Sequence, residues 1–268
     1  MTSAAPGRTG GSPALEARLR VLLPLGVGVV ALVGWQLLVT VGGVSDYLLP
    51  SPAAIVGEVV EFWPAISSAA LVTGANALVG LVVGGAVALL LGALASQWRP
   101  IDAMSAPVVA ALAVVPIVAL APVLNSMFGA DSQFGRQAIA ALASFVPIFI
   151  NTLRGLQQTR AVHRDLMRAY AASPGQAFRA VTFPTAVPYV TTGVRIASSL
   201  AVISALVAEY FGGPRGGLGT FISTSAATSA YARAWAYVAA GIVVGLVFYL
   251  GTALLERIVR SRIPSDAR

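Results

Sequence analysis

Residues 165–190, DLMRAYAASPGQAFRAVTFPTAVPYV, form a polar run between two segments that are almost entirely apolar. The run starts with good helix formers, LMRAYAAS, and Pro174 with Gly175 predicts a break before QAFRAVTFP. This pattern predicts a helix, a turn and a second helix. Five arginines in the run and its flanks favour exposure to water: Arg154, Arg160, Arg164, Arg168 and Arg179.

The composition of the whole chain indicates an integral membrane protein. Of its 268 residues, 57% are hydrophobic and 10% are charged, and the mean hydropathy is +0.83. A soluble domain of this length needs far more polar surface, so lipid must solvate the apolar remainder. The sequence has no cysteine, which excludes disulfides and thiolate metal sites.

Six apolar segments are long enough to cross a hydrocarbon core of about 30 Å, and they are residues 21–41, 68–96, 103–128, 136–153, 186–212 and 234–258. The first is longer than the apolar region of a signal peptide, so we expect a retained helix. Between the first two, residues 53–62 predict a short amphipathic helix at the outer interface, with Glu58 and Glu61 on its polar side.

The arginines predict the orientation of these spans. The net charge of +7 does not point to nucleic acid, because the arginines lie at the ends of apolar runs and not in one patch. With a cytoplasmic N-terminus, the arginines of both tails, of the turn at Arg99 and of residues 154–179 lie in the cytoplasm. Only Arg136, Arg215 and Arg233 then lie outside. This asymmetry follows the positive-inside rule and predicts that both termini are cytoplasmic.

The polar run carries a small apolar face made of Leu166, Met167, Ala169 and Tyr170. No other part of the chain is obviously available to cover this face. Two interpretations are open on composition alone. A partner protein covers the face, or the run is an ordinary loop whose apolar residues lie back on the helices.

Residues 165–184 resemble the cytoplasmic EAA motif of permease subunits in bacterial ATP-binding-cassette importers. In that motif an acid opens a short helix, a glycine follows six residues later, and Leu-Pro comes thirteen residues after the glycine; here these places hold Asp165, Ala171 and Phe183-Pro184. Pro174, Gln176, Phe178 and Thr182 are also in familiar places. Because alanine lacks the freedom of glycine at positive φ, we expect the helix–turn geometry to differ somewhat.

Motifs elsewhere resemble the nitrate, sulfonate, taurine and pyrimidine-precursor branch of these permeases. They are LPSP at 49–52, WRP at 98–100, VVPIVALAPVL in the third span and GGLG at 216–219. The resemblance covers residues 35–260. Each motif is weak alone, but their order and spacing together are specific.

The resemblance implies an all-α integral membrane protein with six transmembrane helices, the type I importer permease fold and a cytoplasmic coupling helix. We expect a disordered cytoplasmic tail over 1–20, a transmembrane domain over 21–260 and a cytoplasmic tail over 261–268. The coupling segment, residues 160–184, is expected to contact the ATPase through Asp165, Arg168, Ala169, Ala171, Ala172, Pro174, Gly175, Phe178 and Pro184.

The resemblance also implies partners in the bacterial inner membrane. These are ATP-binding-cassette ATPase subunits, a second permease chain that is identical or a sister subunit, an extracytoplasmic substrate-binding protein, and membrane lipid. The sequence agrees on one point, because a phosphate-binding P-loop needs a lysine and all 17 basic residues are arginine. We therefore expect ATP hydrolysis on another polypeptide, and no catalytic residue, cofactor or metal in this chain.

Polar chemistry inside the spans is sparse, and Asn76, Arg195 and Glu209 are the candidates for lining a translocation pathway. Arg195 and Glu209 share one face of a helix, but they are about 21 Å apart along it and so cannot touch. A structural reading is open for both, with Arg195 extending to the inner interface and Glu209 exposed at the outer one. His163 has no second ligand near it in the sequence.

The sequence bears on three classes of function. The permease of an ATP-driven importer of a small organic solute fits the motifs, with a pyrimidine precursor, a riboflavin-like molecule, a sulfonate or nitrate as the substrate. A secondary transporter or a channel without an ATPase is the alternative, although no inverted repeat is evident. A membrane enzyme would need convergent catalytic side chains, which one histidine and scattered acids do not supply.

Overall fold

The computed structural model describes residues 13–45, 47–129, 132–212 and 216–262, and all regular structure in these ranges is helical. The elements in chain order are α1 Pro13–Val41, α2 Pro52–Glu61, α3 Trp63–Gln97, α4 Arg99–Ala113, α5 Ile117–Phe128, α6 Phe134–Gln157, α7 Ala161–Ala169, α8 Pro174–Ala177, the π-helical segment Phe178–Thr182, α9 Phe183–Tyr210, α10 Leu218–Ala227 and α11 Tyr231–Ser261. The predicted all-α membrane fold is confirmed.

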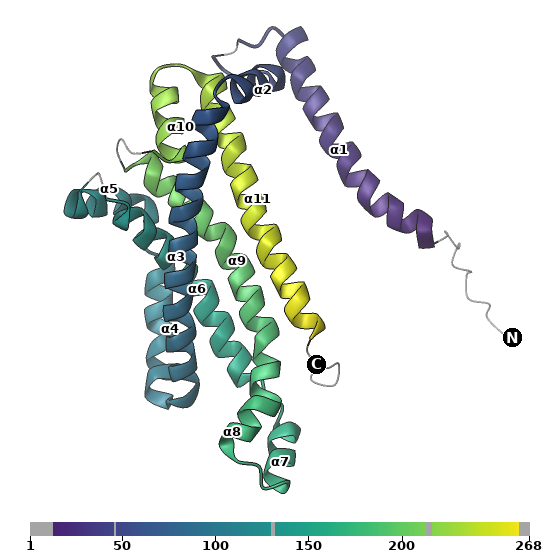
Figure 1. Ribbon diagram of the computed structural model, residues 1–268, viewed down its shortest axis with the longest axis vertical. Helices are drawn as coiled ribbons and strands as arrows, with labels where there is room; N and C mark the ends of the chain where they lie inside the picture. The colour runs from purple at the N-terminus through teal and green to yellow at the C-terminus, as the bar shows by residue number, and fades with distance from the viewer. Residues whose placement is uncertain (1–12, 46, 130–131, 213–215, 263–268) are drawn as a thin grey trace, which may run out of the picture.

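Helices α3, α6 and α9 form the centre of the molecule, and α11 packs along α9 (Figure 1). These helices approach closely because small residues line their contacts. A Cβ atom on Gly84 of α3 would collide with the backbone oxygen of Ala141 on α6. A Cβ atom on Gly193 of α9 would lie 3.0 Å from the backbone oxygen of Pro147 on α6. Larger residues at either glycine would push the central helices apart.

Five helices in the described ranges are long and apolar enough to cross a membrane, and they are Leu22–Val41, Trp63–Gln97, Phe134–Gln157, Pro174–Tyr210 and Tyr231–Ser261. They correspond to the predicted spans other than the third. The helix Pro174–Tyr210 differs most from its predicted span, 186–212, because the helix is continuous from Pro174 through the π-helical segment into α9. The second part of the coupling segment, from Pro174 onward, and a long apolar helix therefore form one continuous helix.

The prediction of one helix over 103–128 is wrong. Helix α4 ends at Ala113 and α5 starts at Ile117, and the two run in different directions (Figure 1). Pro116 lies in the break; it has no N–H to donate, and its ring disfavours the helical conformation at Val115. The apolar run is continuous across this break, so hydropathy alone hid it. Six crossings stay a prediction, in which α4 and α5 together replace the third span.

The two ends of the molecule carry different elements (Figure 1). Helices α7 and α8 and the C-terminal end of α11 lie toward one end, and α2 and α10 lie at the other. The arginine-rich residues 154–179 and the end of α11 thus share one side, as the charge pattern requires. Which side faces the cytoplasm stays a prediction.

Helix α2 corresponds to the predicted interfacial helix. Ser51 caps it by accepting a hydrogen bond from the N–H of Ala54 at 3.1 Å, and Pro52 fits the first turn, where no N–H partner is needed. Glu58 forms an ion pair with Arg233 of α11 at 2.9 Å. The guanidinium of Arg233 also lies 3.6 Å from the centre of the Phe62 ring. These contacts fix α2 across the start of α11.

Helix α1 stands apart from the central helices (Figure 1). It meets α11 in an edge-to-face pair of Trp35 and Trp235, with ring centres 5.6 Å apart. Most of its apolar side chains from Leu22 to Val41 are exposed, which suits a helix in lipid or against a second chain. It begins at Pro13, inside the predicted disordered tail 1–20, and residues 1–12 and 263–268 of the two predicted tails lie outside the described residues.

Candidate functional site

The coupling segment forms one end of the molecule, where α7, a turn, α8 and the π-helical segment lead into α9 (Figure 1). None of the residues in these three helical pieces is buried. Tyr170 is 74% exposed and Leu166 is 47% exposed. Phe178 and Phe183 are also exposed, and they contact each other with ring centres 6.1 Å apart. The described residues therefore leave this apolar face uncovered, unlike a loop that lies back on its own helices.

A tight turn ends α7, and its geometry depends on Ala171. The N–H of Ala171 donates to the carbonyl of Arg168 at 2.9 Å, and the N–H of Ala172 donates to that of Met167 at 3.0 Å. This pair of bonds is a Schellman motif, which needs a left-handed residue after the helix end. Ala171 supplies it with φ of +51°. Alanine carries strain of about 1–2 kcal/mol in this conformation, and the expected difference from the helix–turn geometry of the family stays a prediction.

The break in the coupling segment precedes the predicted one. Pro174 and Gly175 do not interrupt a helix; they start α8, with Pro174 in its first turn. Ser173 caps this helix, because its hydroxyl accepts from the N–H of Gln176 at 3.4 Å and its own N–H donates to the Gln176 side chain at 2.8 Å. The second helix therefore has a well-defined start immediately after the turn.

The predicted coupling residues lie together at this end of the molecule. All are exposed or half-buried, namely Asp165, Arg168, Ala169, Ala171, Ala172, Pro174, Gly175, Phe178 and Pro184. Asp165 does not open the helix, which begins at Ala161, and it pairs with Arg168 at 3.4 Å on the exposed face. Their role in binding an ATPase stays a prediction.

A buried polar network joins α3, α9 and the start of α10 near the other end. Glu209 is fully buried, and its carboxylate accepts hydrogen bonds from the Thr73 hydroxyl at 2.7 Å, the Asn76 amide at 3.1 Å and the Gly219 N–H at 3.2 Å. The Thr73 hydroxyl oxygen accepts in turn from the N–H of Leu218 at 2.9 Å. Two hydroxyl or amide side chains and one backbone N–H therefore donate to this buried carboxylate.

The network continues onto α6 through two amide side chains. The Asn76 amide also donates to the side-chain oxygen of Gln133 at 2.9 Å, and that oxygen accepts from the guanidinium of Arg136 at 2.9 Å. Gln137 donates to the Asn76 oxygen at 3.3 Å. Arg136, expected at the outer surface, is fully buried. Its charge lies close enough to Glu209 for the two to interact electrostatically.

The GGLG motif closes over this network. A Cβ atom on Gly217 would collide with the Glu209 carboxylate, and one on Gly219 would collide with the backbone oxygen of Leu206. Gly216 has φ of +71°, a conformation that favours glycine. These glycines let the chain pass directly over a buried charge.

The structure places Asn76 and Glu209 inside a single chain, with 2% and 0% of their surfaces exposed. Glu209 is not exposed at the outer interface, which was one of the two expectations for it. A pathway between two permease chains would be lined by residues that one chain leaves open. Their pathway role stays a prediction, while their contacts bind three helices together.

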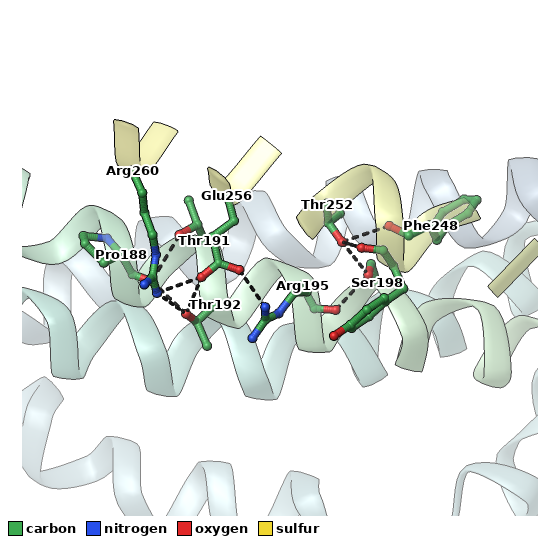
Figure 2. Close-up of polar contacts among 10 residues, drawn as sticks. Pro188, Thr191, Thr192, Arg195, Ser198, Phe248, Thr252, Glu256 and Arg260 are labelled. Carbon is green, nitrogen blue, oxygen red and sulfur yellow. Dashed lines mark hydrogen bonds and ion pairs between the residues drawn. The ribbon is translucent and has the colours of Figure 1, made fainter. Parts of the chain in front are cut away.

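A second network joins α9 to α11 near the coupling end, and Figure 2 shows the Glu256 carboxylate between two guanidinium groups. Arg195 lies 3.2 Å from one oxygen of Glu256, and Arg260 lies 2.7 Å from the other. Thr192 donates to Glu256 at 3.1 Å. Arg195 therefore has an acidic partner in its own chain, and its pathway role stays a prediction.

Glu256 was missed by the sequence analysis, although it lies inside the predicted span 234–258. It is 5% exposed and is the centre of the second network. The available signal was an acid near the C-terminal end of an apolar helix, four residues before Arg260. Its partner Arg195 is remote in sequence, and no pattern on α11 indicates which face meets α9.

Together, the five long apolar helices of the described residues, the buried polar networks and the uncovered coupling segment define a multi-pass membrane protein. The chain belongs to the family of binding-protein-dependent transport system inner membrane components, whose sequence profile matches residues 80–263. It is thus a multi-pass permease component of the inner membrane. The family implies an ATP-binding-cassette ATPase and a substrate-binding protein as partners in an importer.

Named relatives support the predicted branch. The chain is 35% identical over 236 residues to the riboflavin transport system permease protein RibX of Chloroflexus aurantiacus, covering 85% of each chain. It is 34% identical over 182 residues to the formylaminopyrimidine transport permease protein ThiX of Halalkalibacterium halodurans, covering 66% of this chain and 70% of that one. It is 27% identical over 222 residues to the nitrate import permease protein NrtB of a Synechocystis species, covering 76% of each. The predicted resemblance to this branch is confirmed.

Proposed function

We propose that this chain forms the translocation pathway of an ATP-driven importer and is coupled to a separate ATPase through residues 160–184. The uncovered apolar face of the coupling segment carries this proposal. Leu166, Tyr170 and Phe178 are exposed in a segment flanked by arginines, which suits a helix that docks in a groove with an acidic rim. Because α8 continues into α9, movement of the docked end would be transmitted to a central helix.

The proposed assembly contains two permease chains, identical or related, in membrane lipid. The exposed apolar side chains of α1 and α11 supply surfaces for lipid and for a second chain. The network residues Asn76 and Glu209 then hold the shape of the pathway wall from inside each chain. Arg195, which is partly exposed beside Glu256, is the one of the three candidates with access to the outside of its chain.

The substrate proposal rests on the relatives. Two of them are named for riboflavin and for formylaminopyrimidine, which are nitrogen heterocycles, and these match with 35% and 34% identity. The relative named for nitrate matches with 27% identity. We therefore propose a small heterocyclic solute such as a pyrimidine precursor or a riboflavin-like molecule, with sulfonate and nitrate-type anions as the alternatives.

Transport by the reconstituted importer tests this function. Proteoliposomes that hold the permease and its ATPase, supplied with the binding protein, are expected to take up labelled riboflavin or formylaminopyrimidine only with ATP. An ATPase that lacks its P-loop lysine is the control and should give no uptake. The permease alone should hydrolyse no ATP. Uptake that persists without ATP would instead make the chain a secondary transporter or a channel.

The orientation of the chain can be tested with single cysteines, since the natural sequence has none. Ala161 at the start of α7 and Thr228 after α10 are both exposed and lie toward opposite ends of the molecule. Ala161→Cys is expected to react with an impermeant maleimide only after the membrane is opened, and Thr228→Cys in intact cells. Labelling of both from the same side would contradict the topology with cytoplasmic termini.

A further inference from the structure

A cavity of about 780 Å³ opens near the coupling end, where α6, α7, α9 and α11 meet. Among the described residues its ionisable lining groups are Arg160, His163, Arg260 and Tyr189, and none of them is acidic. Pro188 and Tyr189 supply part of an apolar wall. The volume falls within the usual range for a small-molecule site, about 300–1,000 Å³. It is much larger than a free inorganic anion needs.

The wall of this cavity has an excess of positive charge. Arg260 lines it, and Figure 2 shows that the carboxylate beside Arg260 is the one that Arg195 also binds. One negative charge at Glu256 therefore faces two guanidinium groups. Asp165, the acid of the adjacent helix α7, pairs on the exposed surface with Arg168. The positive charges at the cavity are thus only partly neutralised within the described residues.

The start of α7 adds a further positive end to this cavity. Arg160 is the residue before the helix and His163 lies in its first turn, and both line the cavity. No side chain caps this end. The first N–H groups of a helix carry a partial positive charge, and they bind anions when no side-chain acceptor occupies them.

We propose that this cavity binds the phosphate group of an organic ligand. Arginine pairs with phosphate through parallel N–H bonds. Arg160, just before α7, and Arg260 of α11 line the cavity from different elements. The organic part of the ligand lies against Pro188 and Tyr189. Its source is either the headgroup of an anionic phospholipid or a soluble phosphate monoester. The bound group links α7 of the coupling segment to α11 and so restrains the part that contacts the ATPase.

Binding to the purified, delipidated permease–ATPase complex tests this proposal. Native mass spectrometry with added phosphatidylglycerol, compared with phosphatidylcholine, probes the lipid source. Thermal stabilisation by glycerol 3-phosphate, compared with glycerol, probes the soluble source. The wild-type complex is expected to bind at least one phosphate probe over its control. Because each arginine supplies charge-assisted hydrogen bonds, Arg160→Gln with Arg260→Gln should weaken that binding by about tenfold or more.

Arg164→Gln is the matched control, because Arg164 is an exposed arginine of α7 that does not line the cavity. Arg160→Gln alone distinguishes lost binding from misfolding. Arg160 lies at the surface, and no ion pair in the described ranges includes it, so this variant is expected to fold. It should reduce phosphate binding and leave the melting temperature without ligand unchanged. The proposal is overturned if neither phosphate probe exceeds its control, or if the cavity variants bind as well as Arg164→Gln.

Discussion

Replacement of Glu209 by alanine is expected to destabilise the folded chain by about 3–5 kcal/mol, because it removes one side of a buried ionic network. Thr73, Asn76 and Gly219 each donate a hydrogen bond to this carboxylate. The buried Arg136 would also lose a nearby opposite charge. Water does not reach these groups in the folded chain, so the lost bonds would not be replaced. The permease should accumulate poorly and melt at a lower temperature.

The measurement is the yield and melting temperature of detergent-solubilised protein for a set of variants. Glu209→Gln keeps acceptor oxygen and shape, so it should fall between wild type and Glu209→Ala. Glu58→Ala is the control for loss of a partly exposed ion pair, since the Glu58 side chain is 24% exposed, and it should cost about 0–1 kcal/mol. Wild-type stability with lost transport in Glu209→Ala would contradict the structural role and place Glu209 in the pathway.

The helices were predictable because their signal is local. Hydropathy averaged over a span does not depend on contacts, and the long helices α3, α6 and α11 lie where it indicated. The break between α4 and α5 has a local cause too, Pro116, but the apolar run continues through it. A proline within an apolar run is tolerated inside some helices, as Pro147 of α6 shows. Sequence alone therefore does not say which proline ends a helix.

The networks were less predictable because their partners are remote in sequence. Glu209 and Thr73 are separated by 136 positions in the sequence, and the glycine contacts between helices help to set the register that brings them together. Glu209 and Arg195 were found because charge in an apolar span is unusual, yet the contacts that they make were not predicted. Ala171 shows another limit, since the surrounding hydrogen bonds impose a conformation that its residue type disfavours.

An aspartate at position 171 is expected to release the ATPase while the permease still folds. Ala171 is exposed, lies beside the uncovered face formed by Leu166 and Tyr170, and has φ of +51°. Aspartate tolerates this left-handed conformation better than most residues, so the turn after α7 should be retained. In a docked complex the new carboxylate would be buried without a partner, a loss of about 3–5 kcal/mol. Affinity for the ATPase should then fall by about two orders of magnitude or more.

The informative comparison is Ala171→Asp with Ala171→Asn, because asparagine has the same shape and the same tolerance of positive φ without the charge. Ala171→Gly, which relieves the strain, completes the set and should bind the ATPase at least as well as wild type. The ratio of co-purified ATPase to permease is measured beside permease yield. If residues 160–184 served only as a loop, the aspartate and asparagine variants would retain the ATPase equally and keep substrate-stimulated hydrolysis. Loss confined to aspartate, at normal yield, requires a contact that excludes water from position 171, and such a contact is what transmission of force from an ATPase needs.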